Sequence, residues 1–321
     1  MSLFYVENKP PFLFLCVSID EVHSGNTIRK FAEKELSFPA SLLRSLKFLP
    51  SGISVNGQRR NIQYILEKGD LLRLLLEDSR TVHDHLLPFD HPVDVVFENE
   101  YLILLNKPAG LVVHPSHGHY ADTLSNALAH YFMEKRESHT IRPIGRLDKD
   151  TSGLILFAKN QYAASFLEHS RAHGQLSRHY LALVTGCPAP APGTVDLPIA
   201  PSKEQLNLMQ VCEDGLPSRT DYRVLQSFEA NELCPVPYSL VSLHLHTGRT
   251  HQIRVHMSAI GHPLLGDPIY GQKLPSLSRA ALHSSELSGS FPARGGSFQF
   301  HAELPADMQL FISVERTPAS D

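Results

Sequence analysis

The clearest periodic pattern lies in residues 20–78, where apolar positions recur at helical spacing. Thr27 stands where an N-cap is expected, just before a stripe formed by Ile28, Phe31, Ala32 and Leu36. The segment SLLRSLKFL predicts a second short helix, and the Asn56-Gly57 and Lys68-Gly69-Asp70 sequences predict tight turns between short strands. We therefore expect a small α/β unit over residues 20–78, preceded by an extension over residues 1–19.

A second, larger unit is expected over residues 93–315. Short strands and helices alternate there without a strict βαβ repeat, which favours an α+β domain with a mixed, largely antiparallel sheet. The apolar run 154–158 predicts a buried strand, and Asn160 can cap the helix that follows it. Residues 79–92, which include His83 and His85, are expected to form a linker, and residues 316–321 a flexible tail.

Composition changes this picture little. The chain is 42% hydrophobic and 19% charged, as in ordinary soluble proteins, and no apolar run is long enough to cross a bilayer. Its start lacks a basic flank and a cleavage site, so we expect no signal peptide. The four cysteines contain no C-x-x-C pair, which favours a reducing cytoplasm. The net charge of −4 means that a nucleic-acid partner would need a local positive surface.

Two carboxylates lie in a polar loop flanked by glycines, within the segment IRPIGRLDKDTSGLILFAKN. Asp148 and Asp150 stand there beside Arg146 and Lys149, just before the predicted strand, and loops held by a rigid strand often carry catalytic groups. The D-K-D-T sequence resembles the signature of Mg²⁺-dependent haloacid-dehalogenase-like phosphatases. In those enzymes the aspartates follow a hydrophobic strand, whereas here the strand comes after them, so a phosphatase is the weaker alternative.

The longer pattern R-L-D-x-x-T-S-G-L, followed by an apolar strand and A-K, resembles the central motif of the RluA-type pseudouridine synthases. Three further blocks occur in that family's order: LLNKPAGLVVHP, then YLALVTG, then HTGRTHQIRVH. The resemblance covers roughly residues 20–310 of the 321. It departs from the family at Gly145, where a histidine is common.

The resemblance implies an isomerase that converts uridine to pseudouridine in structured RNA without a redox cofactor, nucleotide or metal. Asp148 is then the catalytic residue, Tyr180 stacks on the flipped uracil and can accept its carbon-5 proton, and Arg254 pairs with the Asp148 carboxylate. Attack on the sugar, attack on the base and assistance to elimination all stay open for Asp148. Further substrate contacts are implied for Lys107, His114, Arg146, Thr151, Arg249 and Ile253, with Arg146 filling the space that the uridine vacates.

Thr250 is expected to cap the helix that carries Arg254, and Gly261 to end it.

Residues 20–78 resemble an S-four-like RNA-binding domain. That resemblance implies an RNA-facing surface formed by Arg29, Arg44, Lys47, Arg59 and Arg60. We expect ribosomal RNA to be favoured over transfer RNA as the partner, no membrane, and a monomer. An RNA-binding protein without catalysis is a further alternative, against which the joint presence of Asp148, Tyr180 and Arg254 argues.

Histidines are numerous, but their spacing does not favour a metal site. The set that could suggest one is His114, His117, His119, His251, His256 and His262. No companion carboxylates are placed by spacing, so we expect no metal ligands.

Overall fold

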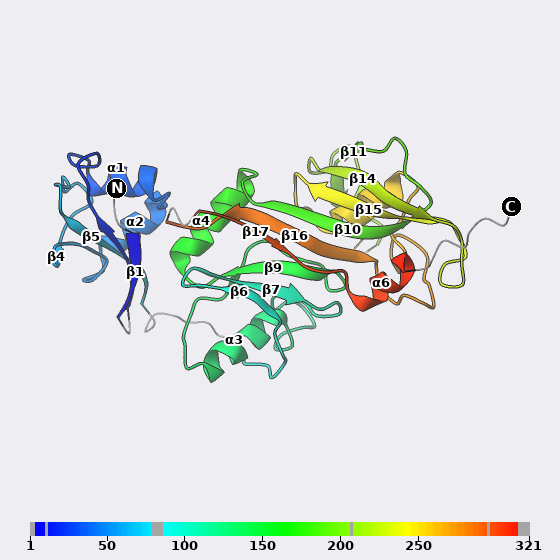
Figure 1. Cartoon of the computed structure of the whole chain (residues 1–321), viewed down its shortest axis with the longest axis horizontal. Coiled ribbons are helices and arrows are strands. Elements are labelled where there is room, and N and C mark those ends of the chain that lie inside the picture. Colours follow the sequence, from blue (N-terminus) through cyan, green and yellow to red (C-terminus); the bar gives the residue numbers. More distant parts are fainter. Residues whose placement is uncertain (1–3, 10–11, 79–85, 206–207, 294–295, 314–321) are drawn as a thin grey trace.

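The structure, a computed structural model, describes residues 4–9, 12–78, 86–205, 208–293 and 296–313. The expected tail and part of the expected linker, including His83 and His85, lie outside the described residues. Figure 1 shows an N-terminal unit at one end and a larger unit built around a long sheet at the other.

The N-terminal unit is a five-stranded sheet in the order β1-β2-β5-β3-β4, with two helices. The strands β1 and β2 arise from the segment that we expected to be a separate extension, so the unit begins near Phe4 and not at residue 20. The reason is burial, because Leu15, Cys16 and Val17 of β2 are fully buried beside β5. The bounds are β1 Phe4–Lys9, β2 Phe12–Ser18, α1 Ile28–Glu35, α2 Ala40–Leu46, β3 Ile53–Val55, β4 Gln58–Arg59 and β5 Leu71–Asp78.

Local signals in this unit are confirmed. The Thr27 side chain caps α1 by accepting a hydrogen bond from the amide of Lys30. Asn56 and Gly57 both have positive φ, 51° and 77°, as the two central residues of a type I′ hairpin turn require. The Asn56 side chain also donates to Asp70 over 2.7 Å, which ties the hairpin to the second turn.

The larger unit contains a ten-stranded sheet whose main path runs β11-β14-β15-β10-β16-β9-β7-β6, with β17 on β16 and β8 on β9. Every pairing in it is antiparallel except that of β9 with β16, so the predicted α+β class is confirmed. The strands β12 and β13 form a separate two-stranded sheet. The bounds are β6 Val95–Glu98, β7 Leu102–Lys107, β8 Arg142–Pro143, β9 Ser152–Ala158, β10 Ser177–Thr185, β11 Gly193–Asp196, β12 Ile199–Pro201, β13 Met209–Val211, β14 Arg219–Phe228, β15 Tyr238–Leu245, β16 Leu282–Ser290 and β17 Ser297–His301.

Four helices accompany this sheet: α3 Leu124–Glu134, α4 Gln161–Ala172, α5 Gln252–Ala259 and α6 Ala306–Ile312. Asn160 caps α4, as predicted. Thr250 does not cap α5, because His251 takes the N-cap position with φ 55° and makes no side-chain cap. The hydroxyl of Thr250 instead accepts a hydrogen bond from Arg146. Gly261 follows the end of α5 with φ 84°, as predicted.

The two units share one hydrophobic core. The rings of Phe38 and Tyr162 stack with centroids 4.6 Å apart, and both side chains are almost fully buried. The hydroxyl of Tyr162 donates to the carbonyl of Leu36 over 2.6 Å, so α4 is fixed to the end of α1. Of the helices in the described part of the chain, none combines the length and the apolar character that a membrane span needs.

Candidate active site

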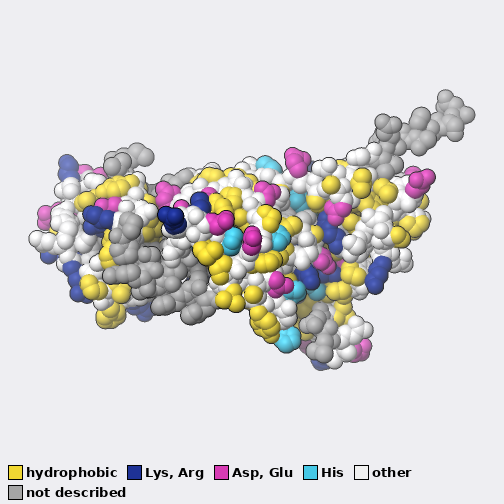
Figure 2. Space-filling model, turned by 90° about the horizontal axis from the view of Figure 1, so that it is seen from below, with side chains coloured by type: hydrophobic (Ala, Val, Ile, Leu, Met, Phe, Trp, Pro, Cys, Tyr) yellow, Lys and Arg dark blue, Asp and Glu magenta, His cyan; other side chains and the backbone are white. Residues whose placement is uncertain are grey.

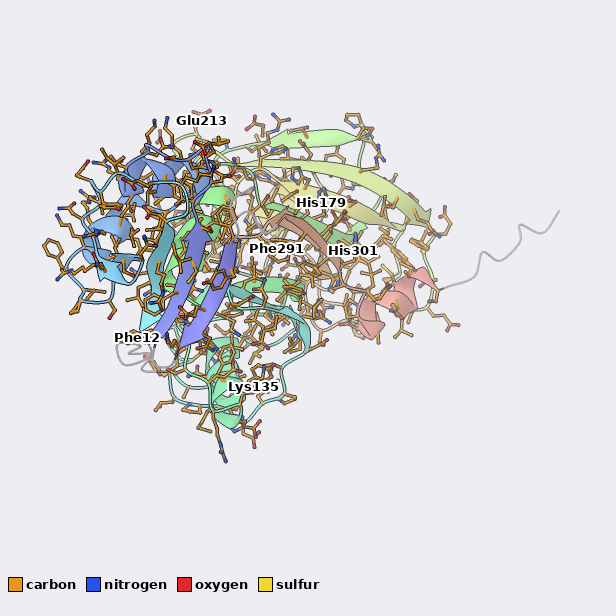
Figure 3. The ribbon with its side chains drawn as sticks, turned by 60° about the vertical axis from the view of Figure 1, so that its left-hand side comes forward. Phe12, Lys135, His179, Glu213, Phe291 and His301 are labelled. Atoms are coloured by element: carbon orange, nitrogen blue, oxygen red, sulfur yellow. The ribbon has the colours of Figure 1, made fainter. Side chains whose placement is uncertain are left out.

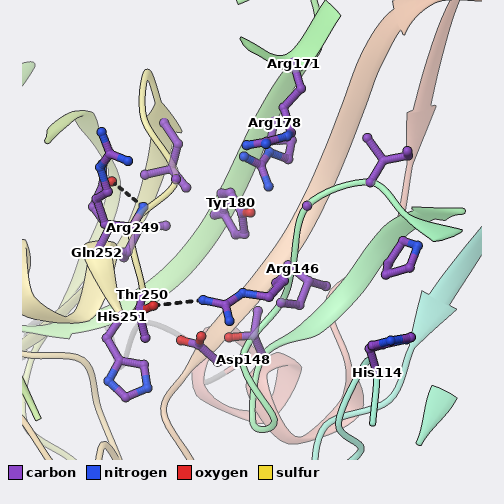
Figure 4. Close-up of a pocket in the computed structure, with 18 of the residues that line it drawn as sticks. His114, Arg146, Asp148, Arg171, Arg178, Tyr180, Arg249, Thr250, His251 and Gln252 are labelled. Atoms are coloured by element: carbon purple, nitrogen blue, oxygen red, sulfur yellow. Dashed lines mark hydrogen bonds between the residues drawn. The ribbon is translucent and has the colours of Figure 1, made fainter. Parts of the chain in front are cut away.

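A cavity of about 850 Å³ opens on the face of the sheet formed by β10, β15 and β16. Three segments far apart in sequence meet there: the loop before β9, strand β10, and the first turn of α5 with the loop before it. Asp148, Tyr180 and Arg254 each line it from one of these segments, as Figure 4 shows for the first two. Cavities of this size hold small ligands, so a whole nucleotide can enter.

Most of the predicted substrate contacts also line the cavity. His114, Arg146, Thr151, Arg249 and Ile253 are all among its lining residues. Leu147, Leu245 and Leu282 add apolar surface. These apolar walls suit a flat heterocyclic base.

Lys107 is the exception. Its side chain is buried, and its ammonium donates to the carbonyl oxygens of Pro108, Leu111 and Lys149 at 2.8–2.9 Å. Burial lowers the pKa of Lys107 to about 7, while three acceptors match the three donors of an ammonium. Lys107 is therefore not among the residues that line the cavity, and its side chain ties the loop after β7 to the loop that carries Asp148.

Arg254 divides its guanidinium between two carboxylates. Its Nε and Nη2 atoms donate to Asp267 over 2.7 Å each, whereas Nη1 lies 3.9 Å from Oδ2 of Asp148. The expected pairing with Asp148 is thus present only as a longer contact, and the bidentate partner is Asp267. Burial alone would raise the pKa of Asp267, but hydrogen bonds from Arg254 and its charge lower the pKa below the ordinary value. Asp148 stays partly exposed, at 28% of its side-chain surface, and so is open to a ligand.

Tyr180 presents its ring to the cavity and is 3% exposed. Burial raises the pKa of Tyr180, so the phenol stays protonated near neutral pH. Ile253, one residue before Arg254, is also buried at the cavity wall. The ring and the isoleucine together offer apolar surfaces to a base.

Sequence reasoning gave no role to several residues that hold the site. Asp267 is the first, although a carboxylate inside the apolar run PLLGDPIYG was a usable signal. Gln252 is the second: its side chain accepts from Thr247 and Arg249 and donates to Arg219, which fixes the loop before α5. Both are positioning residues.

Several arginine side chains give the cavity a positive charge of its own. Arg146 bonds the neutral hydroxyl of Thr250 over 2.8 Å, and Arg249 bonds the carbonyl of Pro217 over 3.3 Å. Arg171 and Arg178, which the sequence reasoning missed, line the same cavity. The site is therefore rich in guanidinium groups, although the chain has a net charge of −4.

The second aspartate of the loop lies elsewhere. Asp150 is not among the residues that line the cavity, and only the two-residue strand β8 precedes the loop. The strand order is thus the one that disfavours a phosphatase.

Within the described ranges, one trio of residues could approach a metal ion: the ligand atoms of Asp221, His244 and His246 lie within 4.8 Å of one another. His244 pairs with His179, which Figure 3 labels, and His179 points away from the face of Tyr180 because it is the adjacent residue of β10. Arg219 lies 3.4 Å from the Asp221 carboxylate and opposes a cation. Asp221, His244 and His246 are not among the six histidines that the sequence suggested as possible metal ligands.

The predicted RNA-facing residues of the N-terminal unit fall into two groups. Arg44, Lys47 and Arg59 are exposed, and Arg59 donates to the Lys47 carbonyl over 2.7 Å, so we call these three the basic cluster. Figure 2 shows several Lys and Arg side chains over this unit. Arg29 is instead paired with Glu33, and Arg60 lies over the ring of Tyr64.

Known proteins resemble this chain over most of its length. A family profile described as RNA pseudouridylate synthase matches residues 101–259. An uncharacterized RNA pseudouridine synthase of Bacillus subtilis, YjbO, is 36% identical over 90% of this chain and 99% of its own length. The ribosomal large subunit pseudouridine synthase D of Zymomonas mobilis is 42% identical over 72% of this chain and 75% of its own. The solved structure of human RNA pseudouridylate synthase domain containing 1 superimposes with a TM-score of 0.54 and 28% identity, covering 66% of this chain and 83% of that one.

Proposed function

Because this chain belongs to the RNA pseudouridylate synthase family and isomerises uridine to pseudouridine in RNA, we propose that Asp148 is its catalytic residue. The observation that carries this proposal is the meeting of Asp148, Tyr180 and Arg254 around one cavity. The family matches support neither a phosphatase nor an RNA-binding protein without catalysis.

The reaction breaks the bond between the sugar and N1 of uracil, turns the base, and joins the sugar to carbon 5. Asp148 acts on the sugar or the base, or assists elimination, from a position 3.9 Å from the guanidinium of Arg254. The detached uracil must stay bound, and the apolar walls at Tyr180 and Ile253 serve this purpose. The raised pKa of Tyr180 suits a stacking role for its ring, because a protonated phenol is a poor proton acceptor near neutral pH.

The base must leave the RNA stack to reach Asp148, which costs a few kcal/mol. Arg146 is exposed at the cavity and donates a hydrogen bond to the hydroxyl of Thr250. A planar guanidinium can stack on bases and bond phosphate, so Arg146 is suited to fill the place of the flipped uridine.

The proposed substrate is a uridine of large-subunit ribosomal RNA, with transfer RNA as the second choice. Several similar proteins carry the name ribosomal large subunit pseudouridine synthase D. The basic cluster of the N-terminal unit offers a second surface for a large RNA.

Mapping pseudouridines in the RNA of a strain that lacks the gene tests both proposals. We expect one or more sites in large-subunit ribosomal RNA to disappear, to return with the wild-type gene, and to stay absent with Asp148→Asn. Asp150→Asn is the matched control, because it removes a neighbouring carboxylate outside the cavity, and it should restore the sites. Restoration by Asp148→Asn would remove that residue from the mechanism, and a site found only in transfer RNA would overturn the substrate proposal.

A further inference from the structure

One end of the cavity holds a guanidinium that the reaction described above does not use. Arg178 precedes Tyr180 by two residues on β10, so both side chains leave the same face of the sheet. Figure 4 shows Arg178 beside Tyr180, on the side away from Asp148. Two residues on a strand are about 7 Å apart, which is a short step along an RNA backbone.

Two glycines from separate segments flank this guanidinium. A Cβ atom at Gly145, in the loop that carries Asp148, would lie 2.9 Å from Nη1 of Arg178. A Cβ atom at Gly248, in the loop before α5, would lie 3.1 Å from Nη2. Both distances are shorter than ordinary contacts, so larger residues at these positions would displace the arginine.

In the described part of the chain, Arg178 interacts with the hydroxyl of Tyr180, which carries no charge while it is protonated. No carboxylate of a described residue forms an ion pair with it, whereas the neighbouring Arg171 is paired with Glu168 at 2.7 Å. Arg178 is half-buried at the cavity wall, where a guanidinium without an anionic partner is costly. An anionic ligand would relieve that cost and would match the planar fork of donors.

We propose that Arg178, seated between Gly145 and Gly248, binds a backbone phosphate of the RNA next to the flipped uridine. This inference rests on the proposed function and names a contact of the same site. The phosphate anchors the strand at one end of the cavity while the base lies between Tyr180 and Ile253. Arg178 is thus a substrate-binding residue whose loss affects the binding of RNA more than the chemical step.

Salt dependence of RNA binding tests the phosphate contact. The probe is an unmodified transcript of large-subunit ribosomal RNA, bound to proteins that also carry Asp148→Asn so that no turnover occurs. Arg178→Ala should weaken binding about tenfold and reduce the slope of log K against log salt by about 0.7–0.9, the loss expected for one phosphate. Arg178→Lys should keep most of the slope, because the charge remains. Arg223→Ala, which removes an exposed arginine from the opposite sheet face, should leave the slope unchanged.

Turnover on the same transcript separates the two proposals. With Asp148 intact, Arg178→Ala should raise KM about tenfold and leave kcat within about threefold of the wild-type value. If the wild-type protein modifies the transcript but Arg178→Ala leaves the salt slope unchanged, the phosphate contact is wrong and the proposed function stands. If the wild-type protein modifies no position in this RNA, the proposed substrate is wrong, whatever Arg178 binds.

A double-mutant cycle tests the seating of the guanidinium. Gly145 has φ 78°, so Gly145→Ala adds backbone strain in any background. In the presence of Arg178 it should also weaken RNA binding, because the new methyl group displaces Nη1. In the Arg178→Ala background that extra loss of affinity should vanish. Equal losses of affinity in both backgrounds would show that Gly145 does not make room for Arg178.

Discussion

The buried pair of Arg254 and Asp267 lies beside Asp148, the carboxylate that we propose is catalytic. The Asp267 carboxylate is fully buried and takes two of the guanidinium donors, and it also accepts from the amides of Ile269 and Tyr270. This arrangement leaves Nη1 of Arg254 pointing toward Asp148. We therefore expect the ion pair to act on catalysis through orientation, because a guanidinium that is fixed on one edge cannot rotate away from Asp148.

Stability and activity should separate when this pair is replaced. Asp267→Ala leaves Arg254 buried without its carboxylate, so we expect a loss of about 3–5 kcal/mol in the free energy of unfolding and a large loss of kcat. The double variant Arg254→Met with Asp267→Leu should regain most of the stability, since apolar pairs often replace buried ion pairs well, but it should regain no activity. Urea unfolding and turnover on the ribosomal RNA transcript measure the two effects.

The matched control for that experiment is Asp307→Ala. It breaks another bidentate ion pair, in which Arg279 donates to both oxygens of Asp307. The Asp307 carboxylate does not line the cavity. We expect lower stability with kcat close to the wild-type value. A double variant at 254 and 267 with substantial turnover would contradict the role assigned to Arg254.

At the scale of elements, the strand β9 holds the loop that carries Asp148. It begins at Ser152, directly after that loop, and its seven residues are all buried. Its parallel contact with β16 passes through Ser152 and His283, whose Nδ1 lies 2.9 Å from the Ser152 hydroxyl. The other ring nitrogen, Nε2, donates to the carbonyl of Ala302, so the neutral imidazole is fully bonded.

Stability should fall in mild acid because of His283. Burial lowers its pKa to about 4, whereas an unfolded histidine has a pKa of about 6.5. Below pH 6.5 the histidine is protonated in the unfolded chain, whereas in the folded chain it stays neutral until about pH 4. Protonation therefore favours the unfolded chain, so the contribution of His283 to stability is present at neutral pH and is lost as the pH falls. Between pH 7 and pH 5 the expected loss is about 2 kcal/mol.

Urea unfolding at pH 7 and pH 5 measures this effect. His283→Asn should be less stable at both pH values, but the part of the acid loss that comes from position 283 should be absent. His301→Asn, at an exposed histidine on β17, should keep the wild-type difference between the two pH values. An unchanged difference in His283→Asn would show that other groups cause the acid loss.

At the scale of the whole molecule, the N-terminal unit is docked and not loosely tethered. The stacked pair of Phe38 and Tyr162 and the hydrogen bond to Leu36 fix it against α4. Removing residues 1–80 would therefore expose the ring of Tyr162 and destabilise the sheet beneath it. The RNA-binding role of this unit is better tested by charge than by deletion.

Replacing the basic cluster should weaken RNA binding without disturbing the fold. Arg44, Lys47 and Arg59 are exposed, so changing all three to alanine should leave Tm within a few degrees of the wild-type value. If each residue contacts one phosphate, the salt slope should fall by about 2–3, with kcat at saturating RNA nearly unchanged. Arg29→Ala is the matched control, because Glu33 already neutralises that guanidinium. Unchanged affinity in the triple variant would remove this surface from RNA binding.

The sequence by itself determined the local features of this protein. Helical spacing and capping residues marked α1 and α4 through Thr27 and Asn160, and the glycine-flanked loop before an apolar run located Asp148. These signals lie within a few residues of what they predict, because hydrogen bonds at helix ends and the burial of one face act over a turn or a strand. The ordered motifs also carried the family and its reaction.

Only the tertiary structure decided which distant groups became partners. Nothing near Arg254 in the sequence indicates that its bidentate partner is Asp267, or that Lys107 is buried against three carbonyls. The tertiary structure also decided that β1 and β2 join the N-terminal sheet, and that Arg178 lies between two glycines. A charged side chain pairs with whatever the sheet brings within a few ångströms, and that choice depends on strand order and not on neighbouring residues.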